Sequence, residues 1–240
     1  MSLDARIAQA SARLVDAVDR HPAVAFASSF GLEDMVILDL IDRLAIEVDV
    51  FTLDTGRLHE ETHALMTRAR ARYRRPIRAL VPDAAELEAY LAAHGSNAFY
   101  DSVELRKRCC EIRKLGPLRR ALAGKSLWIT GLRRGQSAAR AQADVLAYDE
   151  ANGLMKLSPL VDWSEADVQA YVERHDVPVN ALHAQDFPSI GCAPCTRAVQ
   201  PGEDPRAGRW WWEQEGAREC GLHVGADGRL VRASATASAS

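Results

Sequence analysis

Apolar residues recur at helical spacing over residues 3–19, which predicts an amphipathic helix. Short apolar runs of strand length then alternate along the chain with helical patterns. The predicted strands are residues 23–27, 48–53, 77–81 and 127–130, with 154–159 as a fifth candidate. The predicted helices are residues 33–44, a segment from 58 to about 74, and a segment from the N-cap Ser164 to about 175. This alternation predicts an α/β fold with a mostly parallel sheet flanked by helices.

Three polar loops directly follow predicted strands. They are Ser28–Gly31 (SSFG), Asp54–Arg57 (DTGR) and Gly131–Arg134 (GLRR). In parallel sheets, ligands bind beside the carboxyl ends of the strands. The loops offer hydroxyl groups, glycine N–H groups, a helix N-terminus and guanidinium groups, which are the donors that phosphate and sulfate oxygens need. Each loop alone is equally well explained as a turn with a helix cap, but three on one edge favour an anion site.

The pattern changes near residue 188, where the chain becomes rich in proline and glycine and loses its periodicity. We therefore expect an α/β nucleotide-binding domain over residues 1–187 and an irregular C-terminal catalytic segment over residues 188–230. Residues 231–240 have low complexity and are predicted to be disordered. Within the irregular segment, Trp210–Trp212 could anchor it to the sheet domain, and at least one of these tryptophans is expected in the core.

Composition narrows the class of protein. The 240 residues carry a net charge of −3, which predicts no general affinity for nucleic acid. No run of about 18 apolar residues is present, so no membrane span is expected. The first twenty residues carry acids and lack the continuous apolar core of a secretory signal. These features predict a cytoplasmic protein, in which stable disulfides are rare.

Two of the five cysteines are neighbours, Cys109 and Cys110, and two more form the C-x-x-C pair Cys192 and Cys195. A disulfide between neighbours would be strained, because consecutive α-carbons lie about 3.8 Å apart. The C-x-x-C pair alone is ambiguous among zinc, a redox dithiol and an iron–sulfur site. Adjacent helical side chains diverge by about 100°, which suits the separate corners of an iron–sulfur cubane better than one zinc ion.

Basic residues surround the adjacent cysteines, and they could balance the negative charge of such a cluster. They are Arg106, Lys107, Arg108, Arg113 and Lys114. Arg113 and Lys114 follow one helical turn after the cysteines, so they are the favoured neighbours of a cluster or substrate. The alternative, that these bases form a solvated helix face, stays open for the others.

Cys220 has no cysteine partner in the sequence and lies in the polar stretch ECGLH. A lone cysteine is most often a small buried hydrophobe. Here Arg206, Arg209 and His223 are close in sequence, and their charge would favour a nucleophilic thiolate.

These residues together resemble the assimilatory adenylyl-sulfate (APS) reductases, the iron–sulfur branch of the PAPS/APS reductase family. The resemblance runs from about residue 20 to 223. Its motifs are SSFGLED (28–34), LDTGRL (53–58), KRCCEIRK (107–114), GLRRGQS (131–137), KLSPLVDW (156–163), GCAPC (191–195) and ECGLH (219–223). One departure is Gly135, where the family usually has an acidic residue.

The resemblance implies an adenine-nucleotide α-hydrolase-like fold, a [4Fe–4S] cluster on Cys109, Cys110, Cys192 and Cys195, and Cys220 as the catalytic nucleophile. The implied substrate-binding residues are Ser28, Ser29, Thr55, Gly56, Arg57, Lys114, Arg133, Arg134, Arg206, Arg209 and His223.

The implied reaction converts APS to sulfite and AMP through an S-sulfocysteine on Cys220, with APS preferred over PAPS. Reduced thioredoxin or glutaredoxin supplies the electrons, for assimilatory sulfate reduction and cysteine biosynthesis. No flavin or nicotinamide is expected, and the sequence has no G-x-G-x-x-G fingerprint for one. A homo-oligomer is compatible with the sequence.

Two competing hypotheses remain. An ATP-pyrophosphatase-type adenylyltransferase on the same fold would usually carry an SGGxDS loop, from which SSFGLED departs. A non-catalytic iron–sulfur redox sensor would need neither Cys220 nor the loops at the strand ends.

Overall fold

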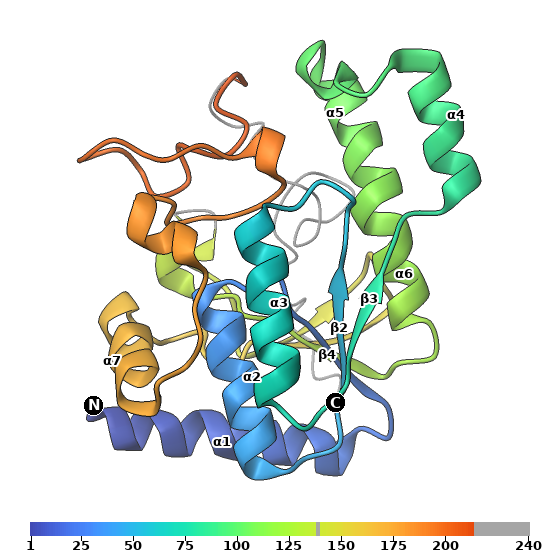
Figure 1. The fold of residues 1–240 in the computed structure, drawn as a ribbon. Coiled ribbons are helices and arrows are strands. Elements are labelled where there is room, and N and C mark those ends of the chain that lie inside the picture. Colours follow the sequence, from blue (N-terminus) through green and yellow to red (C-terminus); the bar gives the residue numbers. More distant parts are fainter. Residues whose placement is uncertain (138–139, 214–240) are drawn as a thin grey trace, which may run out of the picture.

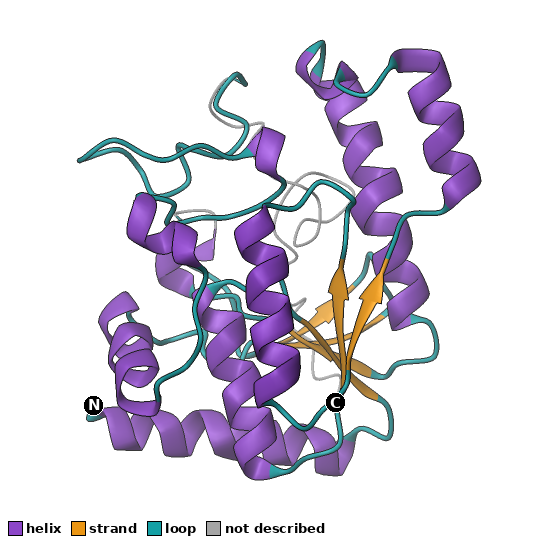
Figure 2. Ribbon diagram, in the orientation of Figure 1, coloured by secondary structure: helices purple, strands orange, loops and turns teal. Residues whose placement is uncertain are grey.

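A computed structural model describes residues 1–137 and 140–213. Its centre is a six-stranded sheet in the order β3-β2-β1-β4-β6-β5 (Figures 1 and 2). The strands are β1 (Val24–Ala27), β2 (Asp49–Leu53), β3 (Ile77–Leu80), β4 (Leu127–Ile129), β5 (Leu146–Asp149) and β6 (Leu154–Leu157). Every pair is parallel except β5 with β6, which is antiparallel. The predicted mostly parallel sheet is therefore confirmed.

Helices cover both faces of this sheet. The helices are α1 (Leu3–Arg20), α2 (Leu32–Leu44), α3 (Glu60–Arg72), α4 (Ala84–His94), α5 (Val103–Cys110), α6 (Gly116–Leu122) and α7 (Glu165–His175). Strand residues alternate between the faces, as the pleat requires. Phe26 and Ile129 pack in the large core with α1, α2, α3 and α7, whereas Ala25 and Trp128 pack in a smaller core with α6.

Local sequence signals set several helix boundaries. Ser2 caps α1, because its Oγ accepts a hydrogen bond from Ala5 N at 3.3 Å. Ser164 and Asp167 form a capping box at the start of α7, which confirms the predicted N-cap. None of the helices within 1–137 and 140–213 has the length and apolar character needed to cross a bilayer.

The segment between β3 and β4 projects beyond the carboxyl ends of the strands as the helical pair α4 and α5 (Figure 1). Tyr90 of α4 donates a hydrogen bond from its hydroxyl to the carbonyl of Leu105 in α5, at 3.2 Å. A π-helical turn, Glu111–Leu115, joins α5 to α6. Such turns are rare in proteins, and many of those that occur lie at functional sites. This one begins directly after the adjacent cysteines.

Candidate active site

The three loops after β1, β2 and β4 meet at one edge of the sheet, where they line a cavity of about 520 Å³. We call it the strand-end cavity. Seven of the predicted substrate-binding residues line it: Ser28, Ser29, Thr55, Lys114, Arg133, Arg206 and Arg209. Its floor includes Trp128 and Thr130, and Arg140 adds a guanidinium group that the sequence analysis did not single out. The cavity therefore combines hydroxyl groups with several positive charges, as an anionic ligand requires.

Asp34, a buried residue of α2, connects two of the loops. Its Oδ2 accepts hydrogen bonds from the N–H and the Oγ of Ser29, both at 2.6 Å. Gly131 lies so close that a Cβ at this position would overlap the Asp34 carboxylate. Burial raises the pKa of Asp34 to about 6, and this effect exceeds that of the Ser29 hydrogen bonds, which lower it. The residue lies within SSFGLED, but its role depends on burial, which the motif does not reveal.

Arg133 is buried beside the cavity and held from two sides. Its Nε donates to Glu33 Oε1 at 2.7 Å, and its Nη1 donates to the carbonyl of Trp163 at 3.3 Å. The carbonyl of Val161 accepts a hydrogen bond from Arg134 N at 2.9 Å. The loop of residues 159–163 thus supports the GLRR loop.

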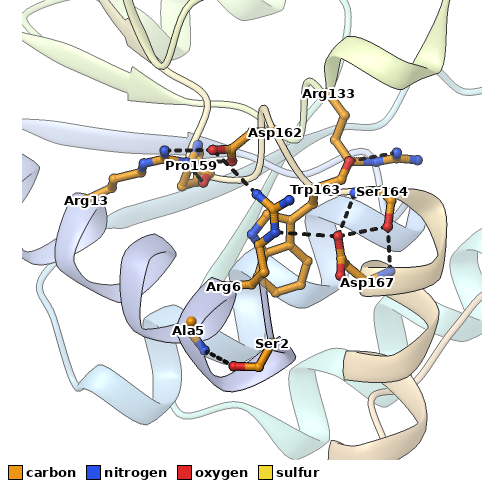
Figure 3. A network of polar contacts seen from close by, with 10 residues as sticks. All are labelled: Ser2, Ala5, Arg6, Arg13, Arg133, Pro159, Asp162, Trp163, Ser164 and Asp167. Carbon is orange, nitrogen blue, oxygen red and sulfur yellow. Dashed lines mark hydrogen bonds and ion pairs between the residues drawn. The ribbon is translucent and has the colours of Figure 1, made fainter.

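Helix α1 in turn holds this supporting loop (Figure 3). Arg13 makes a bidentate pair with Asp162, at 2.9 and 3.0 Å, and also donates to the carbonyl of Pro159 at 2.8 Å. Arg6 lies 3.6 Å from the same Asp162 carboxylate. The Arg13 hydrogen bond is the main reason that the pKa of Asp162 is lowered. A continuous set of polar contacts therefore leads from α1 to Arg133.

The irregular segment closes another side of the cavity. Arg209 is buried, and its Nη1 donates to Ser189 Oγ and to the carbonyl of Ile190, each at 3.3 Å. Its guanidinium lies over the ring of Trp210, 4.7 Å from the centroid. A Cβ at Gly191 would overlap the Arg209 guanidinium, so a larger residue there would force this side chain to shift.

A second, smaller cavity of about 20 Å³ lies next to the first, and all four predicted ligand cysteines line it. We call it the cysteine cavity. Cys109 and Cys110 come from the end of α5, and Cys192 and Cys195 come from a short 3₁₀ turn, Ala193–Cys195, and its N-cap. The DTGR loop holds this turn, because Ala193 N donates to the carbonyl of Arg57 at 2.8 Å. Thr55 Oγ1 also lies 3.2 Å from Cys192 Sγ.

Burial raises the pKa of Cys109 and raises that of Cys195 to about 12. The neighbouring thiols raise both pKa values further. Arg113 lowers the pKa of Cys109, and Lys114 lowers that of Cys195. Four adjacent thiolates would therefore need further positive charge between them. Within the described ranges, no three His, Cys, Asp or Glu side chains converge closely enough to hold one metal ion.

Three of the five basic residues that were predicted near the cysteines lie beside them. Arg106, Arg113 and Lys114 line the cysteine cavity, and Lys114 lines the strand-end cavity as well. Arg113 donates to the carbonyl of Thr55 at 2.6 Å. Arg106 is buried and forms a bidentate pair with Glu213, at 2.8 and 2.7 Å. The other two predicted bases, Lys107 and Arg108, are exposed on α5, as a solvated helix face predicts.

Three predicted substrate-binding residues within the described ranges, Gly56, Arg57 and Arg134, do not line the strand-end cavity. Arg57 lines the cysteine cavity, where it donates to Asn97 Oδ1 at 3.0 Å and to the carbonyl of Ser96 at 2.6 Å. Arg134 is exposed, with its Nε 2.8 Å from the carbonyl of Ala143. Gly56 adopts a φ of 68° beside Arg113. His223, like Cys220, lies outside the described residues.

The parallel sheet with a polar cavity at its carboxyl edge defines an α/β protein of the adenine-nucleotide α-hydrolase-like fold. The phosphoadenosine phosphosulfate reductase domain matches residues 23–198, and the chain belongs to this family of reductases. As predicted from its motifs, it is similar to curated proteins named adenosine 5'-phosphosulfate reductase. The one from Burkholderia cepacia is 51% identical over 222 residues, covering 92% of this chain and 89% of the relative. One from Neisseria meningitidis serogroup B is 50% identical, covering 88% and 86%.

Solved structures agree with this family. Phosphoadenylyl-sulfate (PAPS) reductase from Candida auris, in a phosphate complex, matches with a TM-score of 0.69 and 28% identity, covering 80% of this chain and 90% of that one. FMN adenylyltransferase from Candida glabrata, in complex with FAD and pyrophosphate, matches with a TM-score of 0.58 and covers 90% and 76%. At 13% identity the second match shows a shared fold alone.

Proposed function

We propose that this protein reduces adenosine 5'-phosphosulfate to sulfite and AMP, with reduced thioredoxin as the electron donor. The observation that carries the proposal is the adjacency of the two cavities, which share Lys114. One cavity has the hydroxyl and guanidinium donors suited to a phosphosulfate, and the other has four thiols. The curated relatives bear the name of this activity.

In the proposed reaction, the Cys220 thiolate attacks the sulfur of the APS sulfonyl group. A bond forms between the two sulfur atoms, the bond from that sulfur to the phosphate oxygen breaks, and AMP leaves. Lys114, Arg133, Arg206 and Arg209 are proposed to neutralise the charge that develops on the departing phosphate. A thioredoxin thiolate then attacks the Cys220 sulfur and releases sulfite with the electron pair. The second thioredoxin thiol restores Cys220, so thioredoxin is oxidised by two electrons. Glutaredoxin is an alternative donor of the same kind.

The four cysteines of the cysteine cavity fit a [4Fe–4S] cluster, because two pairs of thiols from separate segments that line one cavity suit the corners of a cubane. When bound, the cluster would supply negative charge that attracts the basic groups and holds them beside the substrate. It would not transfer electrons. Arg106, Arg113 and Lys114 would balance its charge. We also propose the domain division at residue 187. A cytoplasmic location is part of the proposal as well, because reduced thioredoxin and free thiols belong to a reducing compartment.

Sulfite production separates this proposal from its competitors. Purified protein, APS and reduced thioredoxin should yield sulfite and AMP in equal amounts. An adenylyltransferase would instead release pyrophosphate from ATP, and a redox sensor would release nothing. The ratio of kcat/KM for APS to that for PAPS tests the substrate, and a preference for PAPS would contradict the proposal.

The cluster has its own test. Anaerobically purified protein should be brown, and Cys192→Ser should lose both the visible absorption and the iron, together with most activity. Thr67→Ser, on an exposed face of α3, is the matched control. Stoichiometric zinc without iron in the wild-type protein would exclude the cluster.

A further inference from the structure

Three aromatic side chains gather at the surface beside the cysteine cavity. Tyr100, Trp211 and Trp212, which we call the aromatic patch, lie with ring centroids 4.5 to 6.4 Å apart. Tyr100 is 42% exposed and Trp211 is 37% exposed, although each packs against the other two. Large aromatic side chains held at a surface are typical of protein interfaces, where they act as anchors.

Buried contacts hold the aromatic patch in place. Phe99, which is 1% exposed, packs against Tyr100 and Trp212. The Tyr100 hydroxyl donates to the carbonyl of Pro194, inside the C-x-x-C turn, at 2.7 Å. The Arg106–Glu213 pair fixes the chain directly after Trp212. A surface that is ordered before binding loses less entropy when a partner docks.

Chain length places the patch within reach of the proposed nucleophile. Cys220 follows Glu213 by seven residues, which span at most about 25 Å when fully extended. A protein that attacks a sulfur bound to Cys220 therefore docks with its reactive thiol within about 25 Å of Glu213. The aromatic patch is close to Glu213, because Trp211 and Trp212 immediately precede it.

We propose that the aromatic patch is the docking surface for the dithiol protein that reduces S-sulfonated Cys220. The inference rests on the proposed function. The partner's thiolate forms a disulfide with Cys220, the bond from Cys220 to the sulfonate breaks, and sulfite leaves with the electron pair. The partner's second thiol then breaks the mixed disulfide. Trp211 lines neither cavity, so the proposal gives it no part in the reaction of Cys220 with APS.

Trp211→Ala tests the proposal by separating the two half-reactions. The KM for reduced thioredoxin should rise about tenfold, which is the size of effect expected for one interface anchor. AMP release from APS in a single turnover without reductant should be unchanged, and so should sulfite release driven by dithiothreitol. Trp211→Phe should retain much of the thioredoxin affinity. Tyr148→Ala removes an exposed aromatic ring from edge strand β5, where Tyr148 is 49% exposed, and it should leave all three measurements unchanged.

Three results would overturn the docking surface. An unchanged KM for thioredoxin in Trp211→Ala is the first. The second is a loss of sulfite release with dithiothreitol as large as the loss with thioredoxin, which would indicate a structural role for Trp211. The third is a change of oligomeric state with thioredoxin kinetics unaltered, which would make the patch an interface between copies. Failure of the proposed function is distinct, since the wild-type protein would then release no AMP from APS.

Discussion

At the scale of single residues, Asp34 shows how burial and hydrogen bonding compete. Two hydrogen bonds from Ser29 favour the charged carboxylate, yet removal from water has the larger effect and raises its pKa to about 6. The protein thus keeps a charge that is costly to bury at neutral pH. In return, the carboxylate holds the SSFG loop against GLRR at the edge of the strand-end cavity.

This burial predicts a pH-dependent effect of Asp34→Asn. Because the native pKa of about 6 lies above the usual aspartate value of 3.8, the native state binds more protons than the unfolded state between these two pH values. The contribution of Asp34 to stability therefore falls as the pH rises through this window. Asparagine retains an oxygen acceptor for Ser29 but does not titrate. The free energy of unfolding of the variant, relative to wild type, should rise by about 1–2 kcal/mol between pH 5 and pH 8.

Urea unfolding at several pH values measures this difference. Asp16→Asn, which removes a charge from the exposed surface of α1, is the control. A difference between Asp34→Asn and wild type that stays constant with pH would contradict the prediction.

The direction of long side chains marks the limit of sequence reasoning at this scale. The motifs predicted which loops meet at the cavity, because each loop follows a strand. They could not predict that Arg57 turns toward Asn97 or that Arg134 turns toward Ala143. Both partners lie outside the motif that contains the arginine. Likewise, Arg106 is buried because Glu213, more than a hundred residues later, pairs with it.

At the scale of elements, segments with a clear apolar pattern were predictable and segments without one were not. The helix at 3–19 and the first four strands are confirmed within one or two residues, and the fifth candidate strand, 154–159, is confirmed in its first four residues as β6. Strand β5 was missed, because it lies at the antiparallel edge, where its larger apolar side chains, Leu146 and Tyr148, are exposed. Helix α4 was missed as well, and the π-helical turn after Cys110 has no sequence signature. These features depend on tertiary contacts rather than on local periodicity.

The attachment of α1 predicts an effect on ligand binding at a distance. Arg13 and Asp162 hold the loop whose Trp163 carbonyl accepts a hydrogen bond from Arg133 (Figure 3). The carbonyl of Val161 in the same loop accepts one from Arg134 N. Arg13→Ala should loosen this loop and weaken AMP binding several-fold, although Arg13 does not line the cavity. Isothermal titration with AMP measures the affinity.

The same helix provides the control. Arg20 pairs with Asp16 on an exposed face of α1, so Arg20→Ala should leave AMP affinity unchanged. Arg13→Lys should restore part of the affinity, because it keeps the charge but loses the bidentate geometry. Equal AMP affinity in Arg13→Ala and wild type would show that α1 does not position Arg133.

At the scale of the whole molecule, the proposed mechanism divides its tasks among separate parts of the chain. The strand ends bind the nucleotide, the two cysteine pairs hold a cluster, and the chain after Glu213 carries the nucleophile. Lys114 lines both cavities, so the nucleotide and the cluster would lie on either side of the same residue. This division implies that the nucleophile can be removed without disturbing the other two parts.

Cys220→Ser tests that division. Sulfite release should be abolished, because a hydroxyl is a much weaker nucleophile than a thiolate without a dedicated base. The variant should keep its visible absorption and its iron, and it should bind AMP with wild-type affinity, because the cysteine cavity and the strand-end cavity are built from other residues. Wild-type protein given APS without thioredoxin should gain the mass of one SO₃ group on the peptide that contains Cys220. Reduced thioredoxin should then remove that mass and release sulfite. A sulfonate on another cysteine, or wild-type activity in Cys220→Ser, would show that a different residue attacks APS.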